Sequence, residues 1–419
     1  MISNIIPFMI FILFFFVLSF MDTFSIKVND NIKKQLLFFS LCVLVVFAGC
    51  RWSSYEVGYD IAIFDYGTYK NIYNSPLSIF NFLSEYASSD LEIQSQEIGY
   101  VFYSSLCHLL LGENFNLYLL FTNFILIVLF YKSLKRNEIN TALFYLFFFL
   151  ASRLYLQYNF ILLRQAIAMS IIWMWAFPLL LKGEKIKFIL VVFVAATFHF
   201  TAIIALLSFF MVRDLNTKRI VTFIIIVGIL NVTRITDYFI LTIVDHVLSL
   251  MGASGGVGEK LSKYLLEGDA ENGFRGLNMV TFIEALPFLY IVKKYKRILC
   301  QSLVGKFYHN MFYIFVLLLV ITMNFGFLTR MCQYFIFSYF FLISFYYREN
   351  KDVKEQRMLL FLFSNYLLIY SVRYIFIWFY STEYSFFLFN FKNFIAQKAA
   401  INITSPYPTS ATIIPKNIK

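Results

Sequence analysis

The chain consists of long apolar stretches separated by short polar connections. An α-helix needs about 20 apolar residues to cross the roughly 30 Å hydrocarbon core of a bilayer. Ten stretches reach or approach that length, at residues 2–20, 35–50, 116–131, 141–160, 162–181, 219–233, 278–292, 307–325, 328–347 and 357–379. The pattern predicts an all-α, polytopic integral membrane protein with roughly 10–13 transmembrane helices.

Two further apolar stretches do not fit one crossing each. Residues 98–112 are short for a span, and residues 186–212 are long, with His199 near their centre. Basic connections on both sides of 186–212 favour two short helices that meet near His199, or a re-entrant pair. Residues 98–112 are similarly expected to form a half-helix that enters from outside. Non-helical backbone at membrane depth is tolerated only where protein or water covers it, so these breaks indicate a cavity.

Basic residues are concentrated in the connections. Of the 35 Lys and Arg residues, 21 lie in six short segments: 21–35, 132–138, 182–187, 213–219, 293–306 and 348–357. This positive-inside pattern predicts that the six segments face the cytoplasm, and that 141–160 and 162–181 form a hairpin turning near Tyr158 at the outer face. The net charge of +11 therefore reflects membrane topology, and no nucleic-acid partner is expected.

The two long connections have a different character. Residues 50–97 carry seven acidic and two basic side chains, which favours an external loop. Residues 252–276 are rich in Gly and polar groups and are expected to form a second external loop. We expect one membrane domain over residues 1–393, followed by a polar tail at 394–419.

Composition argues against a soluble protein and against metal or cofactor chemistry. Hydrophobic residues make up 60% and charged residues 14% of the chain, too little charge to cover a water-facing surface. Residues 1–20 lack a basic start and a small-residue cleavage site, so they are expected to be a retained first helix.

The five cysteines are scattered and odd in number, which favours buried free thiols. The four histidines are also scattered, and neither a metal nor a cofactor is expected.

The candidate chemistry lies in ionisable residues within or beside apolar helices, where charges are costly unless they are paired or functional. They are Arg51, Arg153, Arg164, His199, Arg330 and Arg373. The predicted topology places all except Arg153 toward the external face. Guanidinium groups bind phosphate bidentately, so this set predicts a site for a phosphate-bearing amphiphile. Simpler interpretations stay open, because Arg153 or Arg373 could snorkel from a helix end and His199 could satisfy a helix break.

Several of these residues lie in short motifs that follow one another along the chain. The motifs are Arg51 after the second span, V-G-x-D ending at Asp60, spaced tyrosines including Tyr69, Glu97 followed by Gly99, L-R-Q-x-x-A containing Arg164 and Gln165, F-H-x-T-A containing His199, and R-M-x-x-Y-F beginning at Arg330. This order resembles the EpsG/Wzy-type family of bacterial polysaccharide polymerases, across roughly residues 45–210 and 325–340. Arg51 and Asp60 are farther apart than in the family pattern, so either Asp60 or Asp65 matches its acidic residue.

The resemblance implies glycosyl transfer at the outer face of the bacterial inner membrane. Its substrates would be oligosaccharide repeat units on undecaprenyl diphosphate, with the growing chain leaving its lipid diphosphate and joining the incoming unit. A diphosphate leaving group needs charge stabilisation, for which Arg51, Arg164 and Arg330 are the candidates. Further expected substrate contacts are Gln165, Tyr69 and Arg373. The expected general base toward the acceptor hydroxyl is Asp60, Glu97 or His199.

Other functions share some of these features. An O-antigen ligase uses the same donor and an arginine-rich outer face, but the order of motifs favours the polymerase. A flippase or transporter of lipid-linked oligosaccharide would also place charges inside a helical bundle. Transporters often contain inverted repeats, and none is detectable in this sequence. A chain-length regulator protein is a further candidate partner, beside the lipid-linked substrates and the bilayer.

Overall fold

A computed structural model of the chain describes residues 2–23, 29–49, 66–94, 96–137, 143–152, 154–233, 235, 242, 279–322 and 329–380. The regular elements within these ranges are all helical, which confirms the all-helical prediction. In chain order they are α1 (Ile2–Thr23), α2 (Asp30–Gly49), α3 (Tyr66–Asn74), α4 (Phe82–Ser88), α5 (Leu91–Gln94), α6 (Ile98–Leu111), α7 (Phe115–Arg136), α8 (Leu143–Ala151), α9 (Leu154–Leu156), η3 (Gln157–Ile161), α10 (Leu163–Ile171), η4 (Ile172–Ala176), α11 (Phe177–Leu181), α12 (Lys185–Phe198), η5 (Phe200–Leu207), α13 (Ser208–Met211), α14 (Thr217–Val232), α17 (Met279–Leu299), α18 (Leu303–Thr322), α19 (Thr329–Cys332), η6 (Gln333–Phe335), α20 (Phe337–Glu349) and α21 (Val353–Tyr380).

Four helical segments in the described part of the chain are long and apolar enough to cross a membrane. They are α2, α7, the continuous segment Leu163–Leu181 and α18. Shorter apolar helices cover Met9–Met21, Ile98–Leu111 and Phe200–Met211. The chain is therefore a multi-pass membrane protein, as predicted, whereas the total of 10–13 crossings stays a prediction.

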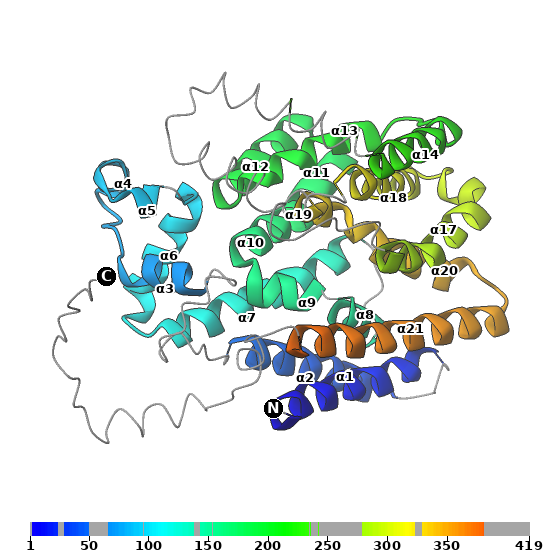
Figure 1. The fold of residues 1–419 in the computed structure, drawn as a ribbon, viewed down its shortest axis with the longest axis horizontal. Coiled ribbons are helices and arrows are strands. Elements are labelled where there is room, and N and C mark those ends of the chain that lie inside the picture. Colours follow the sequence, from blue (N-terminus) through cyan, green and yellow to red (C-terminus); the bar gives the residue numbers. More distant parts are fainter. Residues whose placement is uncertain are drawn as a thin grey trace, which may run out of the picture.

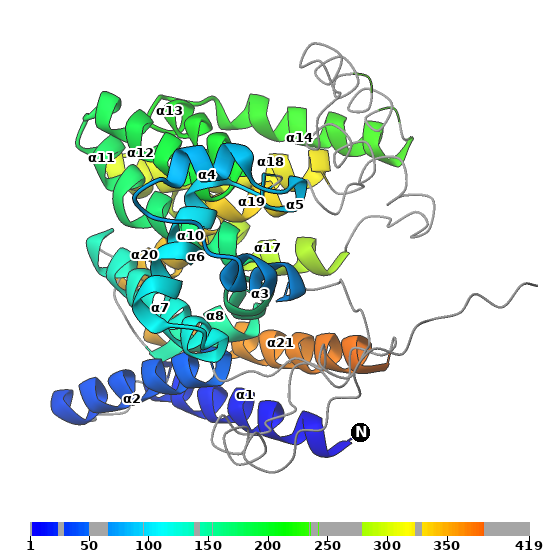
Figure 2. The ribbon, with the colours of Figure 1, turned by 90° about the vertical axis from the view of Figure 1, so that its left-hand side faces the viewer.

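Several groups of helices can be distinguished in both views of the ribbon (Figures 1 and 2). Helices α1, α2 and α21 lie along one side of the molecule, and α12, α13, α14 and α18 lie along the opposite side. Helices α7 to α10 lie between them, so the middle of the bundle is the most deeply covered part. The short helices α3 to α6 gather at one end of the bundle.

Apolar side chains on the outer helices follow the period expected of a lipid-facing surface. On α12, Ile186, Leu190 and Phe193 are all more than half exposed. Their spacing of four and three residues puts them on one stripe of the helix. Exposed Ile225 and Ile229 repeat this arrangement on α14. In a membrane protein such a stripe faces acyl chains, because water would not cover it at low cost.

Buried amides connect the central helix α7 to its neighbours. Asn159 Nδ2 donates to Asn123 Oδ1 at 2.9 Å. Asn137 Nδ2 donates to the Trp173 carbonyl at 2.9 Å, and its Oδ1 accepts from the Tyr308 hydroxyl at 2.7 Å. Lipid tails are as apolar as the side chains of a membrane helix, so the hydrophobic effect does not drive helices together within a bilayer. Interhelical hydrogen bonds of this kind are one of the interactions that associate helices there. They fix the position of the segments that carry the candidate site.

Two breaks in helical geometry appear close to the predicted positions. His199 is extended, with φ −158° and ψ 115°, and separates α12 from the 3₁₀ segment η5. This confirms two short helices that meet at His199. Close to the turn expected near Tyr158, Leu162 leaves helical geometry, with φ −110° and ψ 52°, between η3 and α10. Tyr158 itself lies in the π-helical turn η3, where its ring stacks on Trp173 at 5.7 Å between centroids.

The expected external loop at 50–97 is partly helical. Its described portion carries α3, α4 and α5, all shorter than ten residues. A buried face explains their formation, because Tyr69 and Tyr73 of α3 are almost fully covered by the bundle. The second expected loop, 252–276, and the tail at 394–419 lie outside the described residues. Among the described cysteines, Cys42, Cys107, Cys300 and Cys332 are free thiols, as predicted. Only Cys107 and Cys332 are buried, so the expectation of burial is wrong for the exposed Cys42 and for the partly exposed Cys300.

Candidate functional site

Three helix ends converge on the candidate site. Glu97 is the residue before the first turn of α6, Arg164 is the second residue of α10, and His199 follows the last turn of α12. Residues at helix ends lack part of the regular intrahelical hydrogen bonding, so their backbone can depart from helical geometry. Their side chains can therefore point toward a common site. The packing of α10 and α6 against α12 brings these ends together.

Glu97 joins the other two side chains. Its Oε2 lies 2.6 Å from Arg164 Nη1, and its Oε1 lies 2.8 Å from His199 Nδ1. Arg164 Nη1 also donates to Gln96 Oε1 at 2.6 Å. The Arg164, Glu97 and His199 side chains are 18%, 20% and 19% exposed, respectively. The cluster is therefore largely desolvated but accessible from one side.

The electrostatic environment keeps Glu97 ionised. Burial opposes the charged form, but the hydrogen bond from His199 and the positive charge of Arg164 outweigh it and lower the pKa of Glu97 to about 2. A carboxylate this acidic is a weak base toward a hydroxyl group. Glu97 is better suited to orienting His199 than to removing a proton itself.

His199 is oriented with one ring nitrogen available. The carboxylate of Glu97 can only accept a hydrogen bond, so Nδ1 must donate. In the neutral ring this leaves the lone pair on Nε2. Among the described residues none bonds to that atom, and the ring is partly exposed. The arrangement can accept a proton from a hydroxyl group that approaches Nε2.

Buried tyrosines lie beneath Arg164. The Arg164 guanidinium lies 5.9 Å from the centroid of the Tyr69 ring. Tyr69 contacts Tyr100 in turn, and the Tyr100 hydroxyl bonds to that of Tyr118 at 2.7 Å. Tyr69 is only 1% exposed, so its ring supports the guanidinium from below. A direct contact between Tyr69 and substrate stays a prediction.

Gln165 ties the site to a late part of the chain. Its Nε2 donates to the Arg330 carbonyl at 2.6 Å. Two further bonds hold the same segment, from Trp173 Nε1 to the Tyr334 carbonyl at 2.8 Å and between the Tyr334 and Thr201 hydroxyls at 3.2 Å. The short segment α19–η6 is thus fixed against α10, η4 and η5. The Gln165 side chain is buried, and the contact expected between it and substrate stays a prediction.

Arg330 is in a different environment from that of Arg164. Its side chain is exposed, and among the described residues no carboxylate pairs with it. Arg164, by contrast, is already paired with Glu97. Of the two arginines, Arg330 is therefore the better placed to attract an incoming anion.

The remaining predicted residues cannot be compared with this geometry. Arg51, Asp60, Asp65 and Arg153 lie outside the described residues. Position 373 lies in α21, but its side chain is also outside the described part. Within the described ranges no group of three or more His, Cys, Asp or Glu residues could hold a metal ion. The expectation that no metal takes part stays a prediction.

Gln96 and Gly99 support the site, although neither was among its predicted residues. Gln96 had no distinguishing signal, because a polar residue in an acidic connection is unremarkable. Gly99 was already part of the motif after Glu97, which did not indicate what the glycine does. A Cβ atom at Gly99 would lie 2.8 Å from the Thr197 carbonyl oxygen, which real contacts do not tolerate. Glycine at this position lets α6 approach α12 and so sets the distance between Glu97 and His199.

Comparison with known proteins identifies the family of the chain. No curated protein and no solved structure matches the chain. A family model, that of the EpsG family, matches residues 36–393 and therefore includes every residue of the site. Membership implies a role in exopolysaccharide biosynthesis. Because the match extends over most of the 419 residues, the chain belongs to the EpsG family.

Proposed function

We propose that the chain is a polysaccharide polymerase that joins oligosaccharide repeat units carried on undecaprenyl diphosphate at the outer face of the bacterial inner membrane. The single observation that carries this proposal is the Glu97 carboxylate bonded to both His199 and Arg164 in a protein of the EpsG family. One carboxylate thereby connects a proton acceptor with a phosphate-binding type of side chain. Glycosyl transfer from a lipid diphosphate needs both.

The acceptor side of the reaction uses His199. Its Nε2 takes the proton of the sugar hydroxyl while that oxygen attacks the anomeric carbon at the end of the growing chain. Glu97 holds Nδ1–H and stabilises the positive ring that forms, so it acts as a positioning residue. This assignment favours His199 over Glu97 as the base. Asp60 remains a further candidate for that role.

The donor side uses the arginines. As the bond between the anomeric carbon and the diphosphate oxygen breaks, negative charge grows on the leaving undecaprenyl diphosphate. Arg330, exposed and without a carboxylate partner among the described residues, is the principal contact. Arg164 donates through Nη1 to Glu97 and Gln96, and its positive charge assists Arg330, together with that of Arg51. The reaction as proposed requires no metal or cofactor.

Analysis of surface polysaccharide in a deletion strain tests the proposal. Loss of a polymerase leaves glycolipid that carries a single repeat unit. Unligated long chains would instead indicate a ligase, and repeat units trapped at the cytoplasmic face would indicate a flippase. Complementation with His199→Ala should reproduce the single-unit pattern if the protein is present in the membrane at wild-type amount. Full-length polymer from that variant would exclude His199 as the base.

A further inference from the structure

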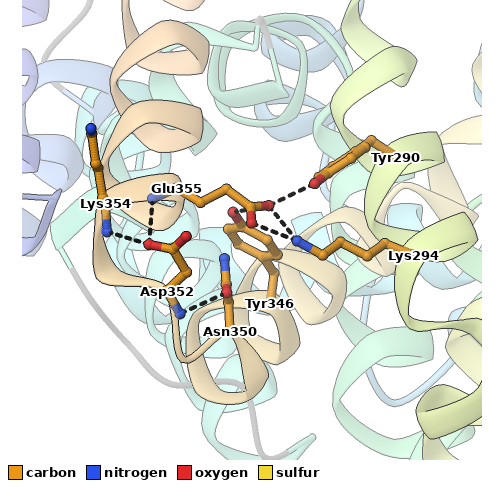
Figure 3. A network of polar contacts seen from close by, with 7 residues as sticks. All are labelled: Tyr290, Lys294, Tyr346, Asn350, Asp352, Lys354 and Glu355. Carbon is orange, nitrogen blue, oxygen red and sulfur yellow. Dashed lines mark hydrogen bonds and ion pairs between the residues drawn. The ribbon is translucent and has the colours of Figure 1, made fainter.

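A second polar cluster lies away from the candidate site, where α17 meets the connection between α20 and α21 (Figure 3). Both oxygens of Glu355 lie 2.6 Å from Lys294 Nζ. The Tyr290 hydroxyl donates to the same carboxylate at 2.6 Å, and the Tyr346 hydroxyl lies 3.4 Å away. These contacts hold the last turns of α17 beside the first turn of α21.

The acidic side chains of this region are all engaged. Glu355 pairs with Lys294, and Glu349 pairs with Arg348 at 3.0 Å. Asp352 accepts hydrogen bonds from the backbone amides of residues 354 and 355 and thereby caps α21. Their charges are therefore committed to local contacts, and the basic residues around them are left to set the potential of the surface.

Five basic side chains remain exposed in the same region and bond to none of the described residues. They are Lys293, Lys296 and Arg297 near the end of α17, and Lys351 and Lys354 at the start of α21. Figure 3 shows the Lys354 side chain pointing away from the pair of Glu355 and Lys294. We call these five residues the α17–α21 basic surface. The ion pair between the two elements keeps its two halves adjacent.

The surroundings of this surface indicate a lipid rather than a soluble partner. Leu289, Ile298, Leu303 and Val353, which are neighbours of the five cations in sequence, are each between 41% and 49% exposed. Cations at helix ends beside exposed apolar side chains match an amphiphile, which presents phosphate to the former and acyl chains to the latter. A soluble polyanion would have no use for the apolar part.

We propose that the α17–α21 basic surface is a binding site for acidic phospholipids of the leaflet that it faces. The lysines and arginine contact the headgroup phosphate, and the exposed apolar residues contact the acyl chains. Basic clusters of four to eight residues beside transmembrane helices commonly bind anionic lipid in this way. The inference rests on this cluster alone and is independent of the reaction proposed above.

The test uses the purified full-length protein. Its thermal stability in detergent is measured with added phosphatidylglycerol or phosphatidylcholine, and retained lipid is counted by native mass spectrometry. The triple variant Lys293→Gln/Lys296→Gln/Arg297→Gln should bind phosphatidylglycerol on the order of 100-fold more weakly, because each cation near an anionic headgroup contributes roughly fivefold. Binding of phosphatidylcholine should not change. Since all three side chains are exposed, the variant should fold.

A matched control decides whether the site is local. Lys132→Gln/Lys135→Gln/Arg136→Gln removes the same charge from the exposed end of α7 and should leave phosphatidylglycerol binding intact. Equal losses in both triple variants would overturn the proposal in favour of general attraction to a basic protein. Stabilisation by inorganic phosphate alone, at the same concentration, would also overturn it. A second variant, Lys351→Gln/Lys354→Gln, should show a smaller loss and tests the other half of the surface.

Discussion

Nδ1 of His199 lies 2.8 Å from Oε1 of Glu97, although the two residues are 102 positions apart in the chain. Glu97 follows the connection before α6, and His199 occupies the break after α12. The contact depends on the close approach of those two helices and on the second bond from Glu97 to Arg164.

Replacing Glu97 by Gln should lower the polymerisation rate while the protein remains in the membrane. The amide cannot stabilise a positively charged His199 ring, and general acid–base catalysis typically contributes a factor of about 10² to 10⁴. Polymerisation of lipid-linked repeat units in vitro measures the effect. Glu113→Gln removes the same charge from the exposed connection after α6 and should retain the wild-type rate. Equal rates for the wild type and Glu97→Gln would show that Glu97 has no part in the reaction.

The ion pairs of Glu97 should contribute to stability in a specific pH range. Its pKa is about 2 in the folded protein and 4.5 as an ordinary carboxyl. Because the folded value is lowered, the contribution is complete above pH 4.5 and is lost as pH falls toward 2. Thermal unfolding of the purified protein and of Glu97→Gln, followed across this range, should show a difference that shrinks with acidification. A difference that grows below pH 4.5 would contradict the assigned charge state.

Gly99→Ala should disturb the geometry of the site, although Gly99 itself contributes no side chain to it. The added methyl group would lie 2.8 Å from the Thr197 carbonyl oxygen, so α6 must move away from α12. Overpacking of this kind typically costs about 1–3 kcal/mol, and the separation of Glu97 and His199 should increase. Activity should fall, with a smaller loss of thermal stability.

Gly228→Ala is the matched control for that substitution. Gly228 also lies within a helix, α14, and a Cβ atom there would approach Val320 Cγ1 only to 3.8 Å. This variant should keep both stability and activity. Similar losses from the two alanines would mean that glycine at 99 has no special role in positioning Glu97.

Arg330→Gln should weaken donor binding without unfolding the protein, because its guanidinium is exposed and only its carbonyl is bonded to Gln165. A charge-assisted hydrogen bond to phosphate contributes about 1.5–3 kcal/mol, so KM for the lipid-linked donor should rise by roughly tenfold or more. Lys218→Gln, an exposed cation at the start of α14, serves as the control. A lower kcat at unchanged KM would instead mean that Arg330 stabilises the transition state but does not contribute to binding of the donor.

Much of the fold could be predicted from the lengths of the apolar stretches and from the positions of the basic residues between them. Each of the ten predicted stretches overlaps a helix, because the bilayer imposes the same length requirement on any sequence. The break at His199 was predictable from two basic connections flanking a stretch too long for one span. The exact residue at which helical geometry is interrupted, Leu162, was not predictable, because the stacking of Tyr158 on Trp173 is a tertiary contact.

The site was predictable as a set of residue types but not as a set of contacts. Motif order singled out Glu97, Arg164 and His199, yet no periodicity indicates that Glu97 bonds to both of the others. Such pairings arise from tertiary packing of helices distant in the chain. The same packing places the Gln165 amide on the carbonyl of Arg330, a contact that the order of motifs did not indicate.

The bond between Gln165 and the Arg330 carbonyl spans 165 residues, and that between Trp173 and the Tyr334 carbonyl spans 161. A ribosome inserting this protein must therefore release the second half of the chain before the first half can assume its final arrangement around α10. Glu97, Arg164 and His199 are synthesised early, but Arg330 joins them only near the end of translation. Nascent or truncated chains that stop before α19 would therefore lack Arg330 and the two bonds that hold its segment against α10 and η4.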